Sequence, residues 1–272
     1  MSFRLSVAMA DPIFEHPRLA QIYDALDPDR SDLEPYLAMA AEFGARSVVD
    51  LGCGTGVLAL LLAQRGIDVV GVDPAGGSLD VARAKEGAET VRWVHGDATD
   101  LAADQADLVL MTGNVAQAVW EQDAWADTLD GVHQALRPGG RFVFETRVPA
   151  RRGWEGWTDA TTRSSTTIDG VGLVESWVDL TDVTLPLVSF RWTFVFGSDG
   201  QVLVSDSTLR FRDEDEIRGD LRMHGFDVDD VRDAPDRPGR ELVFVARRAG
   251  EEHRPCWTRS LHGRGPAPSC SS

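Results

Sequence analysis

The sequence lacks the features that assign a protein to a membrane or to a disulfide-bonded, secreted class. No apolar run approaches the ~18 to 20 residues that a helix needs to cross a bilayer, and the N-terminal residues contain no sustained apolar signal segment. The three cysteines, Cys53, Cys256 and Cys270, have none of the paired spacings that zinc sites or disulfide frameworks require. We therefore expect a cytoplasmic protein with no metal site and no membrane partner.

Positive charge is also scarce. The chain has 27 Lys and Arg against 44 Asp and Glu, a formal net charge of −17. Such a field repels the phosphate backbone of a nucleic acid. The cluster Arg147, Arg151 and Arg152 is too small to reverse the field and is expected to be a solvated loop. A nucleic-acid partner is therefore disfavoured.

Alternating strand and helix patterns begin at Val48. Short β-branched runs are separated by helical patterns, which is typical of repeated βαβ units around a parallel sheet. The 272 residues are enough for one α/β domain with an insertion. We expect strands at 47–51, 68–72, 91–94, 107–111 and 141–146, and helices at 56–65, 78–86 and 123–136.

The pattern changes after Pro149 to strands alone. Phe190, Trp192, Phe194 and Phe196 alternate with less apolar residues, the period of two that is expected where one face of a sheet is buried. The α/β pattern then returns, with a helix that starts at Asp213. The remaining expected strands are 171–180, 202–211, 226–231 and 241–247.

These patterns predict an α/β fold with a seven-stranded, mostly parallel, Rossmann-like sheet, flanking helices and an antiparallel β insertion after the fifth strand. The expected segments are an N-terminal helical lid (1–46), the α/β core (47–149), the insertion (150–212), the completion of the core (213–248) and a disordered tail (249–272).

A glycine-rich loop, Gly52-Cys53-Gly54-Thr55-Gly56, follows the first strand and leads into a helix, where a nucleotide-like ligand can lie close to the backbone. The dinucleotide pattern G-x-G-x-x-G would need a glycine at Val57. About twenty residues on, the second strand ends at Asp73, a carboxylate that can accept hydrogen bonds from ribose hydroxyls. The alternative for Asp73 is that Asp-Pro only starts a turn.

Residues 46–147 resemble the class I, Rossmann-like S-adenosylmethionine-dependent methyltransferases, in particular those that act on small molecules. The resemblance lies in the glycine loop, Asp73, Gly96-Asp97-Ala98, the segment 106–114 around the fourth strand, and Leu136-Arg137-Pro138-Gly139-Gly140, in that order. It implies S-adenosylmethionine as cofactor, S-adenosylhomocysteine as product, and a small-molecule acceptor methylated on oxygen or nitrogen. It does not predict an oligomeric state.

The resemblance also implies which residues bind the cofactor. Gly52, Cys53 and Gly54 would contact its methionine and ribose, Asp73 would hold the ribose, and Pro74 would border the adenine. Asp97 and Ala98 would contact the adenine, Thr112 and Gly113 would lie near the sulfonium, and Tyr23 would cover the cofactor. For Tyr23 the alternative is a place in the core.

No catalytic residue is assigned by the sequence. Asn114, Gln117 and Glu145 are candidates, with Asn114 and Gln117 expected to face the acceptor. For Asn114 the alternative is ordinary turn chemistry, and for Glu145 it is a bond to backbone or to Arg147. Tryptophans in or beside the insertion would roof the acceptor pocket or fill the insertion core: Trp154, Trp157, Trp177 and Trp192.

Two other function classes stay open. A non-catalytic regulatory module that binds S-adenosylmethionine or S-adenosylhomocysteine would retain the same loop and acidic residues. A nicotinamide-dependent oxidoreductase would share the strand, loop and helix, although Val57 argues against it.

Overall fold

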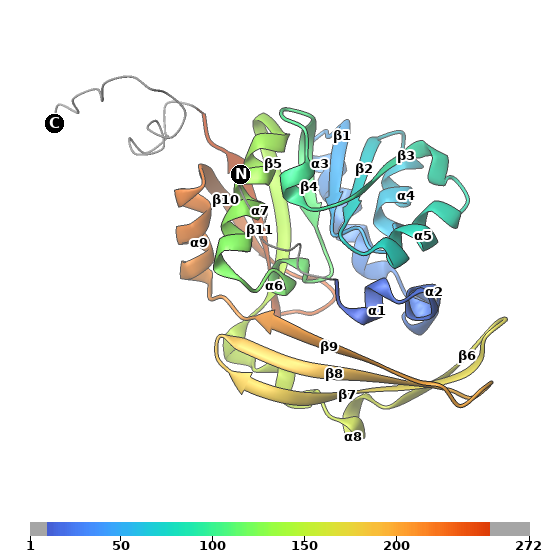
Figure 1. Ribbon diagram of the computed structural model, residues 1–272. Coiled ribbons are helices and arrows are strands. Elements are labelled where there is room, and N and C mark those ends of the chain that lie inside the picture. Colours follow the sequence, from blue (N-terminus) through green and yellow to red (C-terminus); the bar gives the residue numbers. More distant parts are fainter. Residues whose placement is uncertain (1–9, 251–272) are drawn as a thin grey trace, which may run out of the picture.

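A computed structural model describes residues 10–250, and its centre is a seven-stranded sheet (Figure 1). Its strands are β1 (Ser47–Leu51), β2 (Asp68–Asp73), β3 (Val91–His95), β4 (Ala106–Met111), β5 (Leu136–Arg147), β10 (Phe226–Asp233) and β11 (Glu241–Arg248). The strand order is β10-β11-β5-β4-β1-β2-β3. β1 to β5 pair in parallel, whereas β11 is antiparallel to β5 and β10 to β11. The predicted mostly parallel, seven-stranded Rossmann-like sheet is confirmed.

The strand order reverses at β1. The chain moves outward from β1 to β2 and β3 on one side, and from β4 to β5 on the other. In open α/β sheets, ligands bind outside the carboxyl ends of the strands at such a reversal. The topology therefore predicts a ligand site among the residues that follow β1 and β4.

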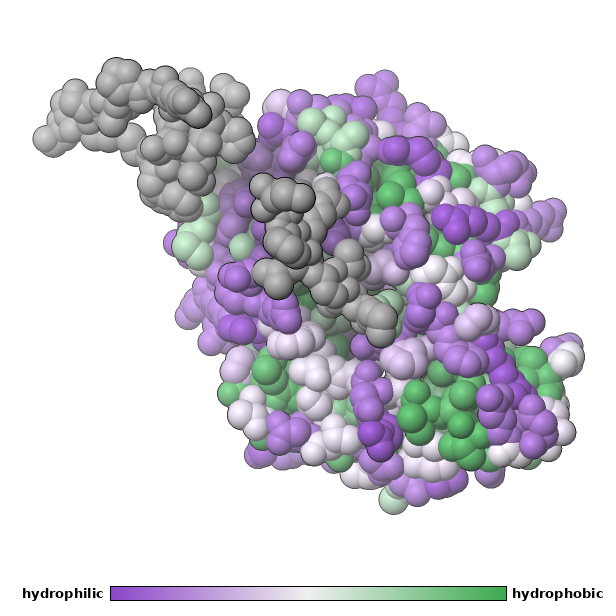
Figure 2. Space-filling view, viewed as in Figure 1, coloured by the Kyte–Doolittle hydropathy of each residue, from purple (hydrophilic) through white to green (hydrophobic). Residues whose placement is uncertain are grey.

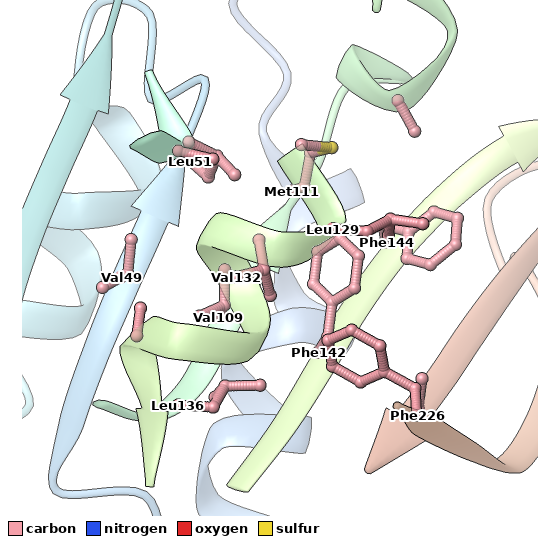
Figure 3. Packing of buried hydrophobic residues seen from close by; sticks show 14 of the residues in the cluster. Val49, Leu51, Val109, Met111, Leu129, Val132, Leu136, Phe142, Phe144 and Phe226 are labelled. Carbon is pink, nitrogen blue, oxygen red and sulfur yellow. The ribbon is translucent and has the colours of Figure 1, made fainter. Parts of the chain in front are cut away.

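Both faces of the sheet are buried, which explains its continuous apolar runs. Val49, Val109 and Phe142 pack in one cluster with Trp125 and Leu129 of the helix α7 (Gln122–Ala135) (Figure 3). Their strand neighbours pack on the other face against α3 (Glu34–Glu42) and α4 (Val57–Ala63). The other helices of this part are α5 (Gly76–Ala84), α6 (Val115–Ala118), α9 (Glu214–Met223) and the short 3-10 helices η1 (Ser31–Leu33), η2 (Ala88–Thr90) and η3 (Ala98–Asp100).

The insertion is a separate antiparallel sheet with the order β6-β7-β8-β9. Its strands are β6 (Ser164–Ile168), β7 (Gly172–Thr184), β8 (Leu187–Phe196) and β9 (Val202–Arg210), preceded by η4 (Pro149–Arg151), η5 (Gly153–Gly156) and α8 (Asp159–Thr162). β6 was not expected, because Ser-Ser-Thr-Thr-Ile carries no apolar alternation. Figure 2 shows hydrophobic residues gathered over this sheet, whose edge strand β9 exposes Val202 and Val204.

The N-terminal helices α1 (Pro12–Glu15) and α2 (Pro17–Leu26) lie between the two sheets (Figure 1). On one side, Ile13 and Ile22 pack with Phe194 and Phe196 of β8. On the other side, the hydroxyl of Ser78 in α5 donates a hydrogen bond to the carbonyl oxygen of Phe14 at 3.0 Å. These helices therefore join the insertion to the core.

One boundary differs from the sequence prediction, and one predicted segment lies outside the described residues. The third predicted helix ends at Ala135, and β5 already begins at Leu136, ahead of Pro138-Gly139-Gly140. Beyond Gly250 the predicted tail lies outside the described residues. Within residues 10–250, no helix is long and apolar enough to span a membrane.

Gly56 is required both for its backbone conformation and for space, so we expect Gly56→Ala to be more destabilising than Gly66→Ala. Both glycines have left-handed φ angles, +80° and +79°, which cost an alanine about 1–2 kcal/mol. A Cβ at Gly56 would also lie 2.8 Å from Cζ3 of Trp93, whereas nothing lies within 4 Å of one at Gly66.

The overlap should add about 1–3 kcal/mol to the loss of unfolding free energy in Gly56→Ala, measured by urea denaturation. The Trp93 ring cannot move away freely, because its Nε1 donates to the Ala88 carbonyl oxygen at 2.9 Å. Equal losses in the two variants would contradict this explanation.

Candidate functional site

The glycine loop connects β1 to α4 through three left-handed glycines, with φ of +76° at Gly52, +53° at Gly54 and +80° at Gly56. The backbone amides of Gly52 and Cys53 donate to the carbonyl oxygen of Val72, at 2.8 and 3.0 Å. A Cβ at Gly52 would lie 2.6 Å from Cγ1 of Val115, whereas a Cβ at Gly54 would meet nothing within 4 Å. The loop is thus packed behind Gly52 and open at Gly54.

Asp73, at the end of β2, is bound to this loop. Its Oδ2 accepts from the Gly54 amide at 2.7 Å, and its Oδ1 accepts from the Ala75 amide at 2.8 Å. The side chain is buried, which raises its pKa, while both backbone bonds act in the opposite direction. Each oxygen retains a lone pair for a further donor, so the carboxylate is placed for ligand hydroxyls beside Gly54.

The segment after β3 is held by its own hydrogen bonds. Oδ1 of Asp97 accepts from the amide and the hydroxyl of Thr99, at 2.8 and 2.6 Å, so that Asp97 caps η3. Ala98 is buried, and a Cβ at Gly131 of α7 would lie 2.6 Å from its carbonyl carbon. Pro74 is half-buried, and its carbonyl oxygen lies 2.9 Å from Nε2 of His95. His95 therefore has a structural role.

The turn after β4 opens beside the glycine loop. Gly113 and Asn114 have left-handed φ angles of +68° and +60°. Gly113 is exposed, and a Cβ added to it would meet nothing within 4 Å. Thr112 is half-buried next to it. Since β1 and β4 are adjacent, Gly54 and Gly113 leave unfilled space at the ends of neighbouring strands.

Glu145 in β5 binds the backbone of this turn. One oxygen accepts from the Asn114 amide at 3.1 Å, and the other accepts from the hydroxyl of Tyr36 in α3. Burial raises the pKa of Glu145, and the nearby charge of Glu241 raises it further. The predicted alternative of a bond to backbone is confirmed, but Arg147 is not its partner.

The two candidates expected to face an acceptor, Asn114 and Gln117, have hydrogen bonds within the protein, and their orientation toward an acceptor stays a prediction. Asn114 is buried, and its Nδ2 donates to Oε1 of Glu241 at 3.2 Å. Gln117 is also buried, and its Oε1 accepts from Nη1 of Arg147 at 3.0 Å. Both amides serve hydrogen bonds within the protein, because the ends of β5 and β11 place charged groups directly behind them.

Tyr36 and Glu241 belong to this network but were not expected from the sequence. Tyr36 lies on an apolar helix and has the pattern of a core residue, while Glu241 begins a strand that pairs it with Arg147. Oε1 of Glu241 also accepts from Nη1 of Arg237 at 2.8 Å. No local pattern marks these residues, because Tyr36 reaches Glu145 across the space between α3 and β5, and the pairing of β11 with β5 brings Glu241 to Asn114.

Tyr23 of α2 lies over the same region. It is half-buried, its ring centroid is 5.6 Å from that of Phe14, and burial raises its pKa. It interacts electrostatically with both Asp73 and Arg147. Tyr23 therefore packs with Phe14 in the apolar cluster of α1, α2 and the insertion, and its place over a cofactor stays a prediction.

Its neighbour Asp24 ties α2 to the glycine loop. Oδ1 of Asp24 accepts from the hydroxyl of Thr55 at 2.6 Å, and Oδ2 accepts from Nζ of Lys85 at 2.5 Å. Nζ of Lys85 in turn donates to the Thr55 carbonyl oxygen at 2.7 Å, and Arg30 pairs with Asp24 at 2.9 Å. Helix α2 is thus fixed to the middle of the glycine loop.

Of the four tryptophans considered for the roof of an acceptor pocket, only Trp157 stays available for that role. Trp154 is buried against Phe211, and Trp192 packs in the insertion core. Trp177 donates from Nε1 to Asp179 and lies under Arg163, on the sheet face away from α1 and α2. Trp157 remains half-exposed, with its ring centroid 5.6 Å from Cζ of Arg147.

Two surface hollows lie away from this region. One of about 420 Å³ follows the edge of β9 and includes Asp11 and Trp120, and the other, of about 550 Å³, lies at the amino ends of the core strands. Within residues 10–250, no cluster of His, Cys, Asp and Glu is arranged to hold a metal ion. The open glycines beside Asp73 are therefore the feature that points to a ligand.

A glycine loop and an acidic residue at the reversal of a Rossmann-like sheet are typical of proteins that bind nucleotide-type cofactors. Residues 48–140 match a family described as a methyltransferase domain. The cypemycin N-terminal methyltransferase of a Streptomyces species is 34% identical over 146 residues, which is 52% of this chain and 60% of that protein. The chain thus spans less than two thirds of the length of this curated relative.

Solved structures cover more of the chain. The CcbJ methyltransferase from Streptomyces caelestis is 25% identical, with a TM-score of 0.66 over 85% of this chain and 97% of its own. An amino pentose methyltransferase from Micromonospora echinaspora, solved with S-adenosylmethionine, is 20% identical, with a TM-score of 0.66 over 84% and 97%; it supports the fold. The chain has the fold of these solved methyltransferases, and residues 48–140 match the methyltransferase domain family.

Asp50 in β1 makes stability depend on pH. Its side chain is buried, its Oδ2 has no hydrogen-bond partner within residues 10–250, and burial, aided by the charge of Asp73, raises its pKa to about 7. Because the folded protein holds this proton more tightly than the unfolded chain, its stabilising contribution is complete below about pH 4 and is lost as the pH rises through 7.

We therefore expect the wild type to lose up to about 4 kcal/mol of unfolding free energy relative to Asp50→Asn between pH 4 and pH 8. Urea denaturation of both proteins across this range measures the difference. A wild-type-minus-variant difference that stays constant with pH would show that Asp50 is ionised in the folded state.

Proposed function

We propose that the protein is an S-adenosylmethionine-dependent methyltransferase that acts on a small molecule. The observation that carries the proposal is the pair of open glycines, Gly54 and Gly113, at the ends of adjacent strands beside the carboxylate of Asp73. Side chains at these glycines would fill the space that a ligand needs. When bound, S-adenosylmethionine supplies a methyl group on a sulfonium, an electrophile with a good leaving group.

The proposed cofactor contacts follow from the placement of each residue. Asp73 would accept from the ribose hydroxyls, and Gly52, Cys53 and Gly54 would line the methionine and ribose. Burial raises the pKa of the Cys53 thiol, so the thiol is neutral. The role we assign to Cys53 is steric, since its small side chain leaves space beside the ligand. Thr112 and Gly113 would lie near the sulfonium, and Tyr23 would cover the cofactor.

The adenine side is proposed at the end of β3. Oδ2 of Asp97 has no hydrogen bond within residues 10–250 and would accept from the adenine amino group. Pro74 would border the ring. The Ala98 carbonyl oxygen already accepts from Leu101 at 3.4 Å, so its contact with a ligand would come from the backbone amide.

Orientation is the main contribution we assign to this chain. Fixing the two reactants in line can supply about 7–11 kcal/mol in favourable cases. Glu145, through Asn114, fixes the turn that would border the sulfonium. The same residue would be a poor general base, because its oxygens already accept from Tyr36 and Asn114. We therefore assign no general base in this chain. The acceptor would react through an oxygen or a nitrogen that has lost its proton to solvent or on binding.

Two alternatives make different predictions. A regulatory module would bind S-adenosylhomocysteine tightly and transfer no methyl group to any acceptor in a broad panel. A nicotinamide-dependent oxidoreductase would bind NAD instead, and Val57 in place of a third glycine argues against it. The acidic net charge argues against a nucleic-acid acceptor.

Asp73→Asn tests the cofactor assignment. Replacing the carboxylate by an amide removes a charge-assisted acceptor worth about 1.5–3 kcal/mol, so we expect binding of S-adenosylhomocysteine to weaken by about 10- to 100-fold. Isothermal titration calorimetry measures this directly. Asp80→Asn is the matched control, because Asp80 is exposed on α5 and pairs only with Arg83. Unchanged binding in Asp73→Asn would overturn the assignment.

A further inference from the structure

Arg147 differs from the other two arginines of its basic cluster. The expected solvated loop describes Arg151 and Arg152, which are exposed, but Arg147 ends β5 with only 27% of its side chain exposed. Burial lowers its pKa, yet a guanidinium stays protonated at neutral pH. A mostly buried cation needs partners of matching charge or hydrogen-bonding capacity.

The protein supplies few such partners to Arg147. Its Nη1 donates to Gln117, but its Nε lies 3.6 Å from Oε1 of Glu241, beyond hydrogen-bonding distance. That oxygen is already used by Arg237 and Asn114. A guanidinium has five N–H donors, and within residues 10–250 Nη2 of Arg147 has no hydrogen bond.

The position of Arg147 places it on the acceptor side of the proposed site. Arg147 ends β5, the strand next to β4, and its Nη1 donates to Gln117 of α6, the helix that follows the turn after β4. The half-exposed ring of Trp157 borders its guanidinium. A molecule beside the sulfonium would meet the charge of Arg147 and the face or edge of Trp157.

The charges around Arg147 leave room for one negative charge. Arg147 and Arg237 both form ion pairs with Glu241, at 3.6 and 2.8 Å, so two guanidinium groups face this one carboxylate. A doubly charged phosphate would be repelled by the nearby carboxyl groups of Glu145 and Glu241, which already act on Arg147. A planar carboxylate matches the two-pronged donor geometry of arginine and carries a single charge.

We propose that Arg147 binds a carboxylate group of the methyl acceptor, whose apolar body lies against Trp157. The acceptor class is therefore a small carboxylic acid, and this inference rests on the proposed methyltransferase function. Arg147 acts as a specificity residue, since it would hold the acceptor without touching the methyl group.

Benzoate and benzamide are suitable probes because they differ in charge but hardly in shape. Each is titrated into the full chain, with and without saturating S-adenosylhomocysteine, and followed by ligand-observed NMR. We expect benzoate to bind at least about tenfold more tightly than benzamide, as a charge-assisted bond should. Equal affinities for the wild type would overturn the proposal without any variant.

Variants then assign the preference to Arg147. Arg147→Gln should abolish the preference for benzoate, and Arg147→Lys should retain part of it, because lysine keeps the charge but loses the fork. Arg152→Gln, an exposed neighbour paired only with Glu155, should behave as the wild type. A preference for benzoate that persists in Arg147→Gln would assign it elsewhere and overturn the proposal.

The same titrations separate the acceptor class from the proposed function. If S-adenosylhomocysteine binds and benzoate is not preferred, the acceptor class is wrong and the proposed function stands. If benzoate is preferred through Arg147 but S-adenosylhomocysteine does not bind, the carboxylate site is supported and the proposed methyltransferase function fails.

Discussion

The hydrogen bond between Asp73 and the Gly54 amide is the contact on which the site depends. At 2.7 Å it joins the end of β2 to a loop that only glycines can form, since Gly52, Gly54 and Gly56 all have left-handed backbones. The amides of Gly52 and Cys53 bind the same strand end through Val72. The loop is thereby fixed before any ligand arrives, packed against Val115 at Gly52 and open at Gly54.

The central sheet could be predicted because its strands are buried on both faces. Val48 packs on one face and Val49 on the other, so the sequence shows an uninterrupted apolar run. β6 could not be predicted in this way. Its residues 164–167 are Ser and Thr, and the strand exists because β7 offers it an antiparallel partner. Sequence patterns report burial, and β6 is mostly exposed.

The same limit applies to the candidate site. The glycine loop and Asp73 are close in sequence, and topology alone brings them together. Asn114 and Glu241 are 127 residues apart, and their bond depends on the register of β11 against β5. The sequence therefore could not predict that the amide nitrogen of Asn114 binds Glu241. The buried network of Tyr36, Glu145, Asn114 and Glu241 joins residues that are far apart in the sequence, so no local sequence pattern predicts it.

Helices α1 and α2 have contacts on two sides. Ile13 donates from its amide to Ser205 of the inserted sheet at 3.0 Å, while Asp24 binds Thr55 in the glycine loop. In the proposed function, a molecule that enters between the core and the insertion would loosen one set of these contacts, and a molecule that leaves would do so again. Opening motions of this kind often limit turnover in enzymes. The first helices of the chain would then set the rate of ligand exchange, separately from the residues that recognise either ligand.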